Sequence, residues 1–374
     1  MSLILFVGGG TLGHIVPAIA IARALQERCP DTSAHFVCSP RGEAEFLKKE
    51  SLPYTIIDSP RLSWDFPWKF FFAHRQSMAL LRSLKPKVVF SKGGYVSVPV
   101  CFAAKKLGIP IILHESDAVM GRANQLIAKM ATHVCLGFPI KNIIADCRLQ
   151  KDISAICNLQ YLFTGNPLRP EITQGSRDEG LRITGFSGTR PILLVMGGSQ
   201  GAQVINEWVA NHLPELTQKY DVIHLTGVGK STTRNQQPGT CSPEPGTRNY
   251  LPLPFAYTEF PHLYACTTIA ISRAGAGSIA ELLGNGIPTI LIPISGLAHD
   301  HQLKNALSLQ ERKVALLVTQ NDMDKDLMNV VSQLMKNSEE YQLMKDRIRK
   351  MQGGDSTGQI VDIISKTLVG KHGA

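Results

Sequence analysis

Two glycine-rich turns in this chain contain the residue types that hold phosphate groups. The first, residues 8–13, follows the apolar run 3–7, and the second, residues 197–202, follows the apolar run 192–196. Glycine lets the backbone approach an anion closely, and the helix expected after each turn supplies N–H groups and a partial positive charge. The turns therefore predict two phosphorylated ligands, one for each of two α/β domains.

The first turn also matches a shorter motif for dinucleotides. Gly8, Gly10 and Gly13 satisfy G-x-G-x-x-G, which requires an acidic residue after the second strand to hold the ribose. Arg41 follows that strand instead, and it would suit only a 2′-phosphate. NADP binding therefore stays an alternative.

The second turn matches the nucleophile elbow of serine hydrolases. Residues 197–201 satisfy G-x-S-x-G, and Asp300 and His301 follow later in the chain. A triad needs its histidine between the acid and the serine, and two adjacent residues on one loop fit that geometry poorly. A hydrolase stays an alternative, as does tight strand–helix packing without any ligand.

The elements that must position these turns alternate between strand and helix. Expected strands cover residues 3–7, 34–38, 87–91, 109–114, 133–136, 192–196, 222–225, 268–272, 289–293 and 314–318. Expected helices cover residues 17–28, 98–107, 122–131, 204–213 and 356–369. Such series build mostly parallel sheets with right-handed crossovers, so the fold class is α/β with doubly wound domains.

A polar, glycine-containing stretch after residue 164 marks the expected domain boundary. The first domain then spans residues 1–164 and the second spans residues 165–355, two domains of ordinary size. The terminal helix, residues 356–369, has apolar residues on one face and could pack back on the first domain.

The formal net charge of +9 favours an anionic partner: phosphate, an acidic membrane or nucleic acid. The basic residues are scattered, so nucleic acid is not expected. The eight cysteines show no C-x-x-C spacing, and Cys38, Cys101, Cys135 and Cys266 lie in or beside apolar runs. This predicts free thiols of a reducing compartment and no metal site. We recognise no signal peptide and no apolar run long enough to span a membrane.

Seven ordered motifs together resemble one family of enzymes. They are residues 9–14 (GGTLGH), 93–97 (GGYVS), 114–115 (HE), 165–169 (GNPLR), 197–202 (GGSQGA), 273–276 with Glu281, and 300–302 with 305–306. Their order and spacing are similar to those of the MurG glycosyltransferases over nearly the whole chain. The resemblance implies the GT-B architecture, two Rossmann-like domains facing a cleft. It also implies inverting transfer of N-acetylglucosamine from UDP-GlcNAc to lipid I, which gives lipid II for peptidoglycan synthesis.

The resemblance implies which residues bind the acceptor. Backbone N–H groups of two glycine turns would hold the lipid diphosphate. The residues of these turns are Gly9, Gly10, Thr11, Gly13, Gly93, Gly94 and Tyr95. His14 would be the general base that takes the proton from the acceptor hydroxyl, and a helix-start hydrogen bond without chemistry is the alternative.

The donor would belong mainly to the second domain. The residues implied to bind UDP-GlcNAc are Thr11, Gly13, Asp117, Arg169, Ser199, Gln200, Gly201, Arg273, Gly275, Ala276, Ser278, Glu281 and Gln302. Ser199 and Arg169 would contact the phosphates, and Glu281 the ribose hydroxyls. Ser278 and Glu281 also match a capping box, the structural alternative for Glu281. No obligatory cofactor is implied, although a divalent cation could stimulate the reaction.

Some positions depart from the family pattern. Leu12 and Val98 replace glycines near the acceptor turns, and Asp117 replaces an asparagine that contacts the donor sugar in the family. An ionised aspartate only accepts hydrogen bonds, whereas asparagine also donates them. A paralogous glycosyltransferase with another UDP-sugar or polyprenyl acceptor therefore stays open. An enzyme similar to UDP-GlcNAc 2-epimerase and a non-catalytic GT-B scaffold are the alternatives from other classes.

An aromatic segment suggests contact with a membrane. Its aromatic residues are Trp64, Phe66, Trp68, Phe70, Phe71 and Phe72. Lys69, His74 and Arg75 lie beside them, and aromatic rings with basic neighbours suit the surface of an anionic bilayer. The segment predicts a peripheral membrane protein, and the family resemblance implies that the membrane is the bacterial cell membrane, at its cytoplasmic face. A core helix with buried aromatic rings is the alternative.

Overall fold

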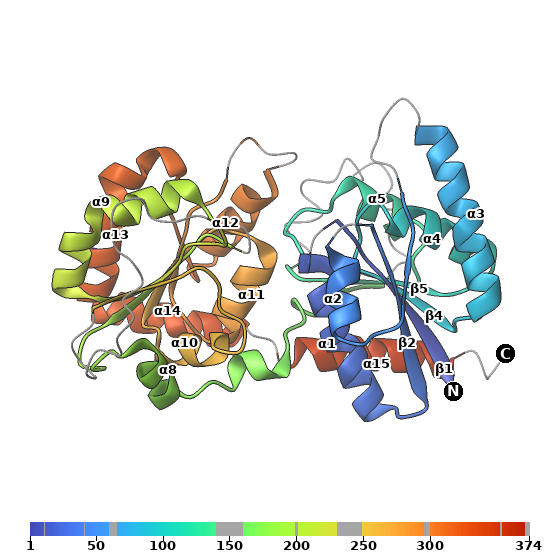
Figure 1. Cartoon of the computed structure of the whole chain (residues 1–374), viewed down its shortest axis with the longest axis horizontal. Helices are drawn as coiled ribbons and strands as arrows, with labels where there is room; N and C mark the ends of the chain where they lie inside the picture. The colour runs from blue at the N-terminus through green and yellow to red at the C-terminus, as the bar shows by residue number, and fades with distance from the viewer. Residues whose placement is uncertain are drawn as a thin grey trace. The chain divides into compact units, whose positions relative to one another are not determined.

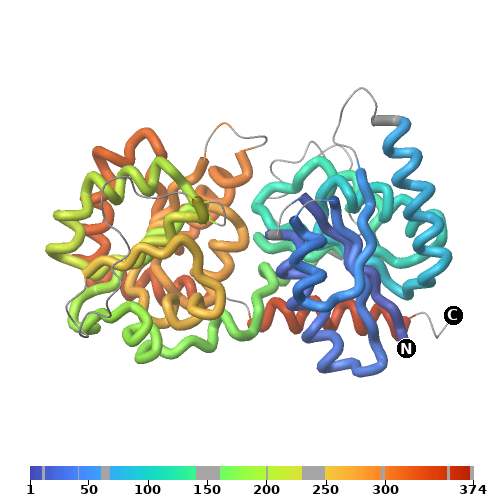
Figure 2. The backbone as a smooth tube through the Cα atoms, viewed as in Figure 1, coloured from blue at the N-terminus to red at the C-terminus, as the bar shows by residue number. Residues whose placement is uncertain are grey.

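The computed structural model describes residues 1–10, 12–40, 42–59, 66–139, 160–198, 201–229, 249–294, 296, 300–351 and 354–370. The chain divides into two compact units (Figures 1 and 2). Unit 1 consists of Met1–Leu168 and Gly354–Ala374, and unit 2 consists of Arg169–Gly353. Each unit is an α/β domain around its own parallel sheet, as the alternation of strands and helices predicts.

Unit 1 is built on a seven-stranded parallel sheet in the order β3-β2-β1-β4-β5-β6-β7. Its strands are β1 (Ser2–Val7), β2 (Thr32–Cys38), β3 (Tyr54–Ile56), β4 (Val88–Ser91), β5 (Ile111–Glu115), β6 (His133–Leu136) and β7 (Gln160–Phe163). The strand order reverses at β1, which pairs with both β2 and β4. The turns that follow β1 and β4 therefore emerge beside each other at the carboxyl edge of the sheet, where such folds bind ligands.

Helices cover both faces of this sheet (Figure 1). One core lies under α3 (Phe66–Leu84), α4 (Ser97–Lys106) and α5 (Arg122–Ala128), and the other lies under α1 (Leu12–Arg28), α2 (Glu43–Lys49) and α15 (Ser356–Val369). In β1, Leu5 and Val7 enter the first core, whereas Ile4 and Phe6 enter the second. Because both faces are covered, the strand is apolar throughout instead of alternating.

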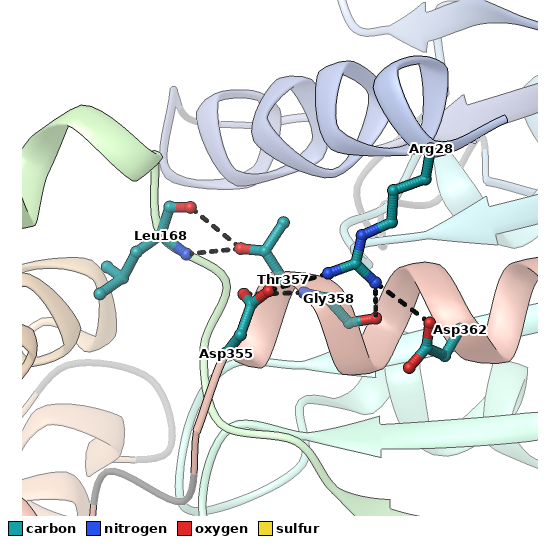
Figure 3. Close-up of polar contacts among 6 residues, drawn as sticks. All are labelled: Arg28, Leu168, Asp355, Thr357, Gly358 and Asp362. Atoms are coloured by element: carbon teal, nitrogen blue, oxygen red, sulfur yellow. Dashed lines mark hydrogen bonds and ion pairs between the residues drawn. The ribbon is translucent and has the colours of Figure 1, made fainter. Parts of the chain in front are cut away.

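Helix α15 follows unit 2 in the chain but packs against α1 of unit 1. Ile360, Val361 and Ile364 are buried in the second core. Near the start of the helix, the Thr357 hydroxyl accepts a hydrogen bond from the Leu168 N–H at 3.2 Å and donates one to the Leu168 carbonyl at 2.9 Å (Figure 3). This residue therefore ties the last helix to the end of the first segment of unit 1.

Charged groups add to the same contact. Arg28, the last residue of α1, forms ion pairs with Asp355 and with Asp362, each at 3.1 Å (Figure 3). Its guanidinium also donates to the carbonyl of Gly358 at 3.4 Å. These side chains are about half exposed, so the ion pairs contribute less to stability than the buried apolar face of α15.

Unit 2 is built on a six-stranded parallel sheet in the order β10-β9-β8-β11-β12-β13. Its strands are β8 (Ile192–Met196), β9 (Asp221–Leu225), β10 (Tyr250–Leu253), β11 (Ile269–Ser272), β12 (Thr289–Leu291) and β13 (Leu316–Leu317). Its α-helices are α8 (Arg177–Thr184), α9 (Gln203–Lys219), α10 (Phe260–Cys266), α11 (Ala276–Gly284), α12 (His301–Glu311), α13 (Met323–Lys336) and α14 (Ser338–Met351). Because β8 pairs with both β9 and β11, the turns after β8 and β11 share one edge of the sheet.

Strands β3, β7 and β10 were not expected from the sequence. Each lies at an outer edge of its sheet. Edge strands are only partly buried and so lack the continuous apolar run that marks a central strand. The expected free thiols are confirmed, since Cys38, Cys101, Cys135 and Cys266 are buried and unbridged.

Candidate functional site

The two glycine turns of unit 1 pack directly against each other. Gly9 lies so close to Val96 that a Cβ at Gly9 would come within 2.8 Å of the valine side chain. A Cβ at Gly94 would overlap the carbonyl oxygen of Gly9, and the φ of Gly94 is +85°. Only glycine satisfies both the space and the positive φ. The structure therefore brings the two expected acceptor turns together, with Gly13 and Tyr95 exposed beside them.

His14 lies in the first turn of α1, half-buried beside these glycines. Its Nδ1 is 2.8 Å from the carbonyl oxygen of Gly9, which can only accept, so Nδ1 carries the proton. Nε2 is then the nitrogen that can take up a proton. Burial lowers the pKa of His14, the bond to Gly9 opposes this shift, and the charge of Lys92 adds to it. The imidazole is therefore neutral at neutral pH, as a general base must be.

A buried carboxylate that the sequence analysis missed occupies part of the first turn. Glu43 accepts a hydrogen bond from the Gly10 N–H at 2.5 Å and another from the Ser39 hydroxyl at 3.0 Å. The N–H of Gly10 is thus already paired within the protein. A phosphate would have to use other N–H groups of the turns or displace Glu43. In the sequence, Glu43 lies two residues beyond Arg41, which stands where the dinucleotide motif would require an acid.

A second missed residue is the lysine before the turn at Gly93. Lys92 is buried, and its Nζ lies 2.7 Å from His114 Nδ1 and 2.7 Å from Ser116 Oγ. The other nitrogen of His114, Nε2, donates to the Gly165 carbonyl at 3.0 Å, which leaves Nδ1 to accept from the lysine. Burial lowers the pKa of Lys92 to about 7. This chain of bonds links the ends of β4 and β5 to the segment after β7.

The loop that contains Asp117 is held by the carboxylate of Glu115. This carboxylate accepts from the Asp117 N–H at 3.0 Å, the Gly121 N–H at 3.2 Å and the Asn124 amide at 2.8 Å. Burial, together with the charge of Asp117, raises the pKa of Glu115 to about 7. The negative charge of Asp117 raises the pKa of both His14 and Lys92. Asp117 therefore lies near these two residues, at the same edge of the sheet.

In unit 2, the turn after β8 has the backbone expected of an anion-binding loop. Gly198 has φ +80° and Gly201 has φ +66°, and a Cβ at Gly201 would overlap the Thr226 carbonyl. Helix α9 follows with Ala202 as its N-cap, and no side chain among the described residues caps its N-terminus. Of the residues expected at the glycine turns, Ser199 and Gln200 lie outside the described part of the chain, as does Thr11 of unit 1.

Glu281 does not form the capping box that the sequence allowed. Helix α11 begins at Ala276 with Gly275 as its N-cap, so Ser278 lies inside the helix and caps nothing. The carboxylate of Glu281 instead accepts a hydrogen bond from the Tyr264 hydroxyl at 2.8 Å. Burial raises the pKa of Glu281, while that bond and the positive charge of Arg169 oppose the shift. The capping interpretation is therefore wrong.

Arg169 lies in the same cluster, with its guanidinium 5.4 Å from the ring centre of Tyr257. Its Nε is buried without a hydrogen-bond partner among the described residues. A guanidinium with an unused donor, next to an exposed aromatic ring, could bind an anionic ligand. Tyr257 and Tyr264 were not among the residues expected from the sequence.

Two other residues expected to bind the donor are engaged within the protein. Arg273 is buried, and its terminal nitrogens donate to the Ile292 carbonyl at 3.1 Å and to the Gln320 side chain at 2.9 Å. The Gln302 side-chain oxygen accepts from the Ile294 N–H at 3.1 Å, which leaves its amide N–H₂ for a ligand. Arg273 thus stabilises the turn after β11 through hydrogen bonds inside unit 2.

Residues 66–72 of the aromatic segment lie in the first half of α3, Phe66–Leu84 (Figure 1). Trp68, Phe71 and Phe72 are 72%, 51% and 65% exposed. Phe70 was expected among them but packs on the core and against Phe102 with ring centres 5.9 Å apart, because it lies on the inward face of the helix. The Phe66 side chain and Trp64 lie outside what the structure describes.

No group of His, Cys, Asp and Glu among the described residues could hold a metal ion. No helix within these residues is long and apolar enough to cross a membrane.

Known proteins resemble this chain over most of its length. The glycosyltransferase family 28 N-terminal domain matches residues 4–136, and the family 28 C-terminal domain matches residues 192–357. The UDP-N-acetylglucosamine--N-acetylmuramyl-(pentapeptide) pyrophosphoryl-undecaprenol N-acetylglucosamine transferase of Lachnoclostridium phytofermentans is 34% identical, over 98% of this chain and 99% of that protein. The chain belongs to the MurG family of glycosyltransferase family 28.

Two further MurG-family comparisons agree. A Bacillus cereus protein of the same name, numbered transferase 2, is 34% identical over 98% of this chain and 100% of that protein. The crystal structure of MurG from Acinetobacter baumannii has a TM-score of 0.75 at 23% identity, covering 98% of this chain and 100% of that one. The fold is therefore the GT-B architecture of two Rossmann-like domains, and the protein is a glycosyltransferase.

Proposed function

We propose that the protein transfers N-acetylglucosamine from UDP-GlcNAc to lipid I with inversion at the anomeric carbon. The observation that carries this proposal is the hydrogen bond between His14 Nδ1 and the Gly9 carbonyl. Because Nδ1 is bound there, Nε2 is available as a base next to two glycine turns. The relatives with 34% identity carry the name of this reaction.

In the proposed mechanism, His14 Nε2 takes the proton from the acceptor hydroxyl as its oxygen attacks the anomeric carbon. The bond to UDP breaks on the opposite face, and UDP leaves with the bonding electrons, so an α-linked donor gives a β-linked product. Free N–H groups of the turns at Gly9 and Gly94 hold the acceptor diphosphate. The Gly10 N–H becomes available only if Glu43 moves.

Unit 2 binds the donor in this proposal. Glu281 accepts hydrogen bonds from the ribose hydroxyls, since only one of its oxygens is used by Tyr264. Arg169 and Ser199 bind the phosphates of UDP, and the N-terminus of α11, which has no capping side chain, adds N–H groups. The Gln302 amide and Asp117 contact the sugar. Positive protein groups, rather than an obligatory metal, stabilise the leaving UDP.

The membrane assignment rests on α3 and on charge. Three exposed aromatic rings on one helix, next to Arg75, suit the headgroup region of an anionic bilayer. The acceptor's lipid chain would then stay in the membrane while its head reaches the glycine turns. We accordingly propose a peripheral protein at the cytoplasmic face of the bacterial cell membrane.

The experiment that tests the reaction is transfer of label from radioactive UDP-GlcNAc to a short-chain lipid I analogue. Labelled lipid product supports the proposal. Binding of UDP-GlcNAc without transfer would point to another acceptor or to an epimerase. Absence of both binding and transfer would favour a non-catalytic scaffold.

A further inference from the structure

Lys92 brings a positive charge into the interior of unit 1. Its side chain is buried, and its Nζ donates to Ser116 Oγ and to His114 Nδ1, both at 2.7 Å. A buried ammonium loses its hydration, so it needs negative groups nearby. Its two hydrogen-bond partners are uncharged, because burial and the charge of Lys92 hold the pKa of His114 well below its ordinary value.

The negative groups flank Ser116 in the sequence. Glu115 precedes it and Asp117 follows it, and both carboxylates raise the pKa of Lys92 against the effect of burial. The Asp117 N–H also donates to the Glu115 carboxylate, which keeps the two acidic residues on one tight loop. Two carboxylates and one ammonium therefore share the carboxyl end of β5.

We propose that Lys92 is a positioning residue that balances the charge of Asp117, so that residues 116–121 present an ionised carboxylate to the donor sugar. The assignment of Asp117 to the sugar rests on the proposed function, whereas the coupling between Lys92 and Asp117 does not. An ionised aspartate only accepts hydrogen bonds, so it selects sugar groups that donate them. Without the ammonium, nothing would offset the negative charge of Asp117 in this interior region, so the loop would shift or take up a proton; Glu115, whose pKa is already raised to about 7, adds only part of a charge.

The test is a double-mutant cycle of Lys92→Met and Asp117→Asn in the full chain at pH 6.5. Methionine removes the charge at similar length, and asparagine removes the opposite charge at the same shape. The readouts are the midpoint of thermal unfolding and kcat/KM for UDP-GlcNAc with the lipid I analogue. Lys106→Met, at an exposed lysine of α4, is the matched control and leaves both readouts unchanged.

We expect Lys92→Met alone to lower the unfolding midpoint by about 3 °C or more and kcat/KM by about tenfold. In the Asp117→Asn background the same substitution should reduce each readout by less than about a third as much, because Glu115 then has no second carboxylate beside it to repel. Equal losses in both backgrounds would overturn the proposal. If Lys92→Met folds only together with Asp117→Asn, the proposal is supported; if neither variant folds, it is contradicted.

A change of pH separates charge balance from simple packing. Burial lowers the pKa of Lys92 to about 7, so at pH 9 the ammonium is lost and the coupling should fall close to zero. Coupling that is unchanged at pH 9 would contradict the proposal. The charged or titratable groups that face Lys92 are His14 on α1, His114 and Glu115 on β5, Asp117 after β5, and Cys135 on β6.

The thermal readout also keeps the two proposals apart. It needs no turnover, so coupled unfolding midpoints without any sugar transfer would refute the proposed function and leave the role of Lys92 standing. If sugar transfer occurs but the effects of Lys92→Met and Asp117→Asn on the unfolding midpoint and on kcat/KM are additive, the proposed function is supported and the role of Lys92 is refuted.

Discussion

Unit 1 carries 21 Lys and Arg residues against 13 Asp and Glu, a formal net charge of +8, whereas unit 2 carries 18 against 17, a net charge of +1. The titratable groups near the turns differ as well. In unit 1 the buried ones include Glu43, Lys92, His114 and Glu115, while in unit 2 the buried Arg273 follows β11 and Tyr264 pairs with Glu281 of α11. One scaffold of strand, turn and helix thus serves two chemistries. In the proposed function, unit 1 supplies the base and binds the anionic lipid acceptor, and unit 2 binds the nucleotide.

The substitution His14→Ala gives the strongest test of the proposed difference between the two units. If unit 1 supplies the base, the substitution lowers kcat by about 10²- to 10⁴-fold and leaves UDP-GlcNAc binding unchanged, because His14 is not among the residues proposed to bind the donor. Transfer assays and calorimetry with UDP-GlcNAc measure the two effects. His35→Ala, at a half-buried histidine of β2, is the control. If His14→Ala reduced the affinity for UDP-GlcNAc as much as it reduced kcat, the proposal that separate units supply the base and bind the donor would be wrong.

The pH profile of the wild-type protein sharpens the same assignment. A base must be unprotonated, and burial lowers the pKa of His14 from 6.5. The acid limb of kcat/KM should therefore have its midpoint below pH 6.5. If the Lys92 ammonium is needed as proposed, kcat/KM should also fall on the alkaline side, because the pKa of Lys92 is about 7. An acid limb with its midpoint above pH 6.5 would speak against His14 as the base.

Glu281→Ala tests the opposite half of the comparison. Loss of a charged acceptor for the ribose should raise the Kd of UDP-GlcNAc about 10- to 100-fold, with a smaller effect on kcat at saturating donor. Tyr264→Phe, which removes only the hydroxyl that Glu281 accepts, should have a lesser effect. If Glu281→Ala lowers kcat and leaves the Kd unchanged, unit 2 does more than hold the nucleotide.

Replacing Trp68, Phe71 and Phe72 with serine tests the membrane face of unit 1. Because these rings are exposed, their loss should weaken binding to anionic liposomes about tenfold while the Kd of UDP-GlcNAc stays the same. Sedimentation with vesicles and calorimetry give both values. Unchanged vesicle binding would mean that the aromatic rings of α3 have another partner.

Thr357→Val has the smallest expected effect. It removes both hydrogen bonds to Leu168 and should lower the free energy of unfolding of unit 1 by about 1 to 2 kcal/mol. Arg28→Ala, at exposed ion pairs, should cost less than about 1 kcal/mol. Hydrogen exchange resolved by unit would detect the loss in unit 1 and none in unit 2. Equal loss in both units would show that they unfold together.

Much of the fold could be predicted because buried parallel strands are continuous apolar runs. The expected strands at 133–136 and 192–196 coincide with β6 and β8, and the terminal helix coincides with α15. The glycine turns could also be predicted, because a positive φ or a close backbone contact at these positions excludes other residues.

The site residues that were missed have no local pattern. Glu43 and Lys92 look like ordinary charged residues at the start of a helix and the end of a strand. Their roles come from partners distant in sequence, as when Gly10 donates to Glu43 across 33 positions. Phe70 was misplaced for a related reason, because the packing of α3 decides which of its aromatic residues face inward.

The discontinuity of unit 1 sets an order of events during synthesis. The ribosome completes Arg169–Gly353 before it makes α15, so unit 2 has its whole sequence while unit 1 still lacks Ile360, Val361 and Ile364 from one of its cores. Although domains emerge from the N-terminus, the one that begins first here is the one that can finish last. A nascent chain arrested before residue 356 would present the apolar faces of α1 and β1 uncovered to chaperones.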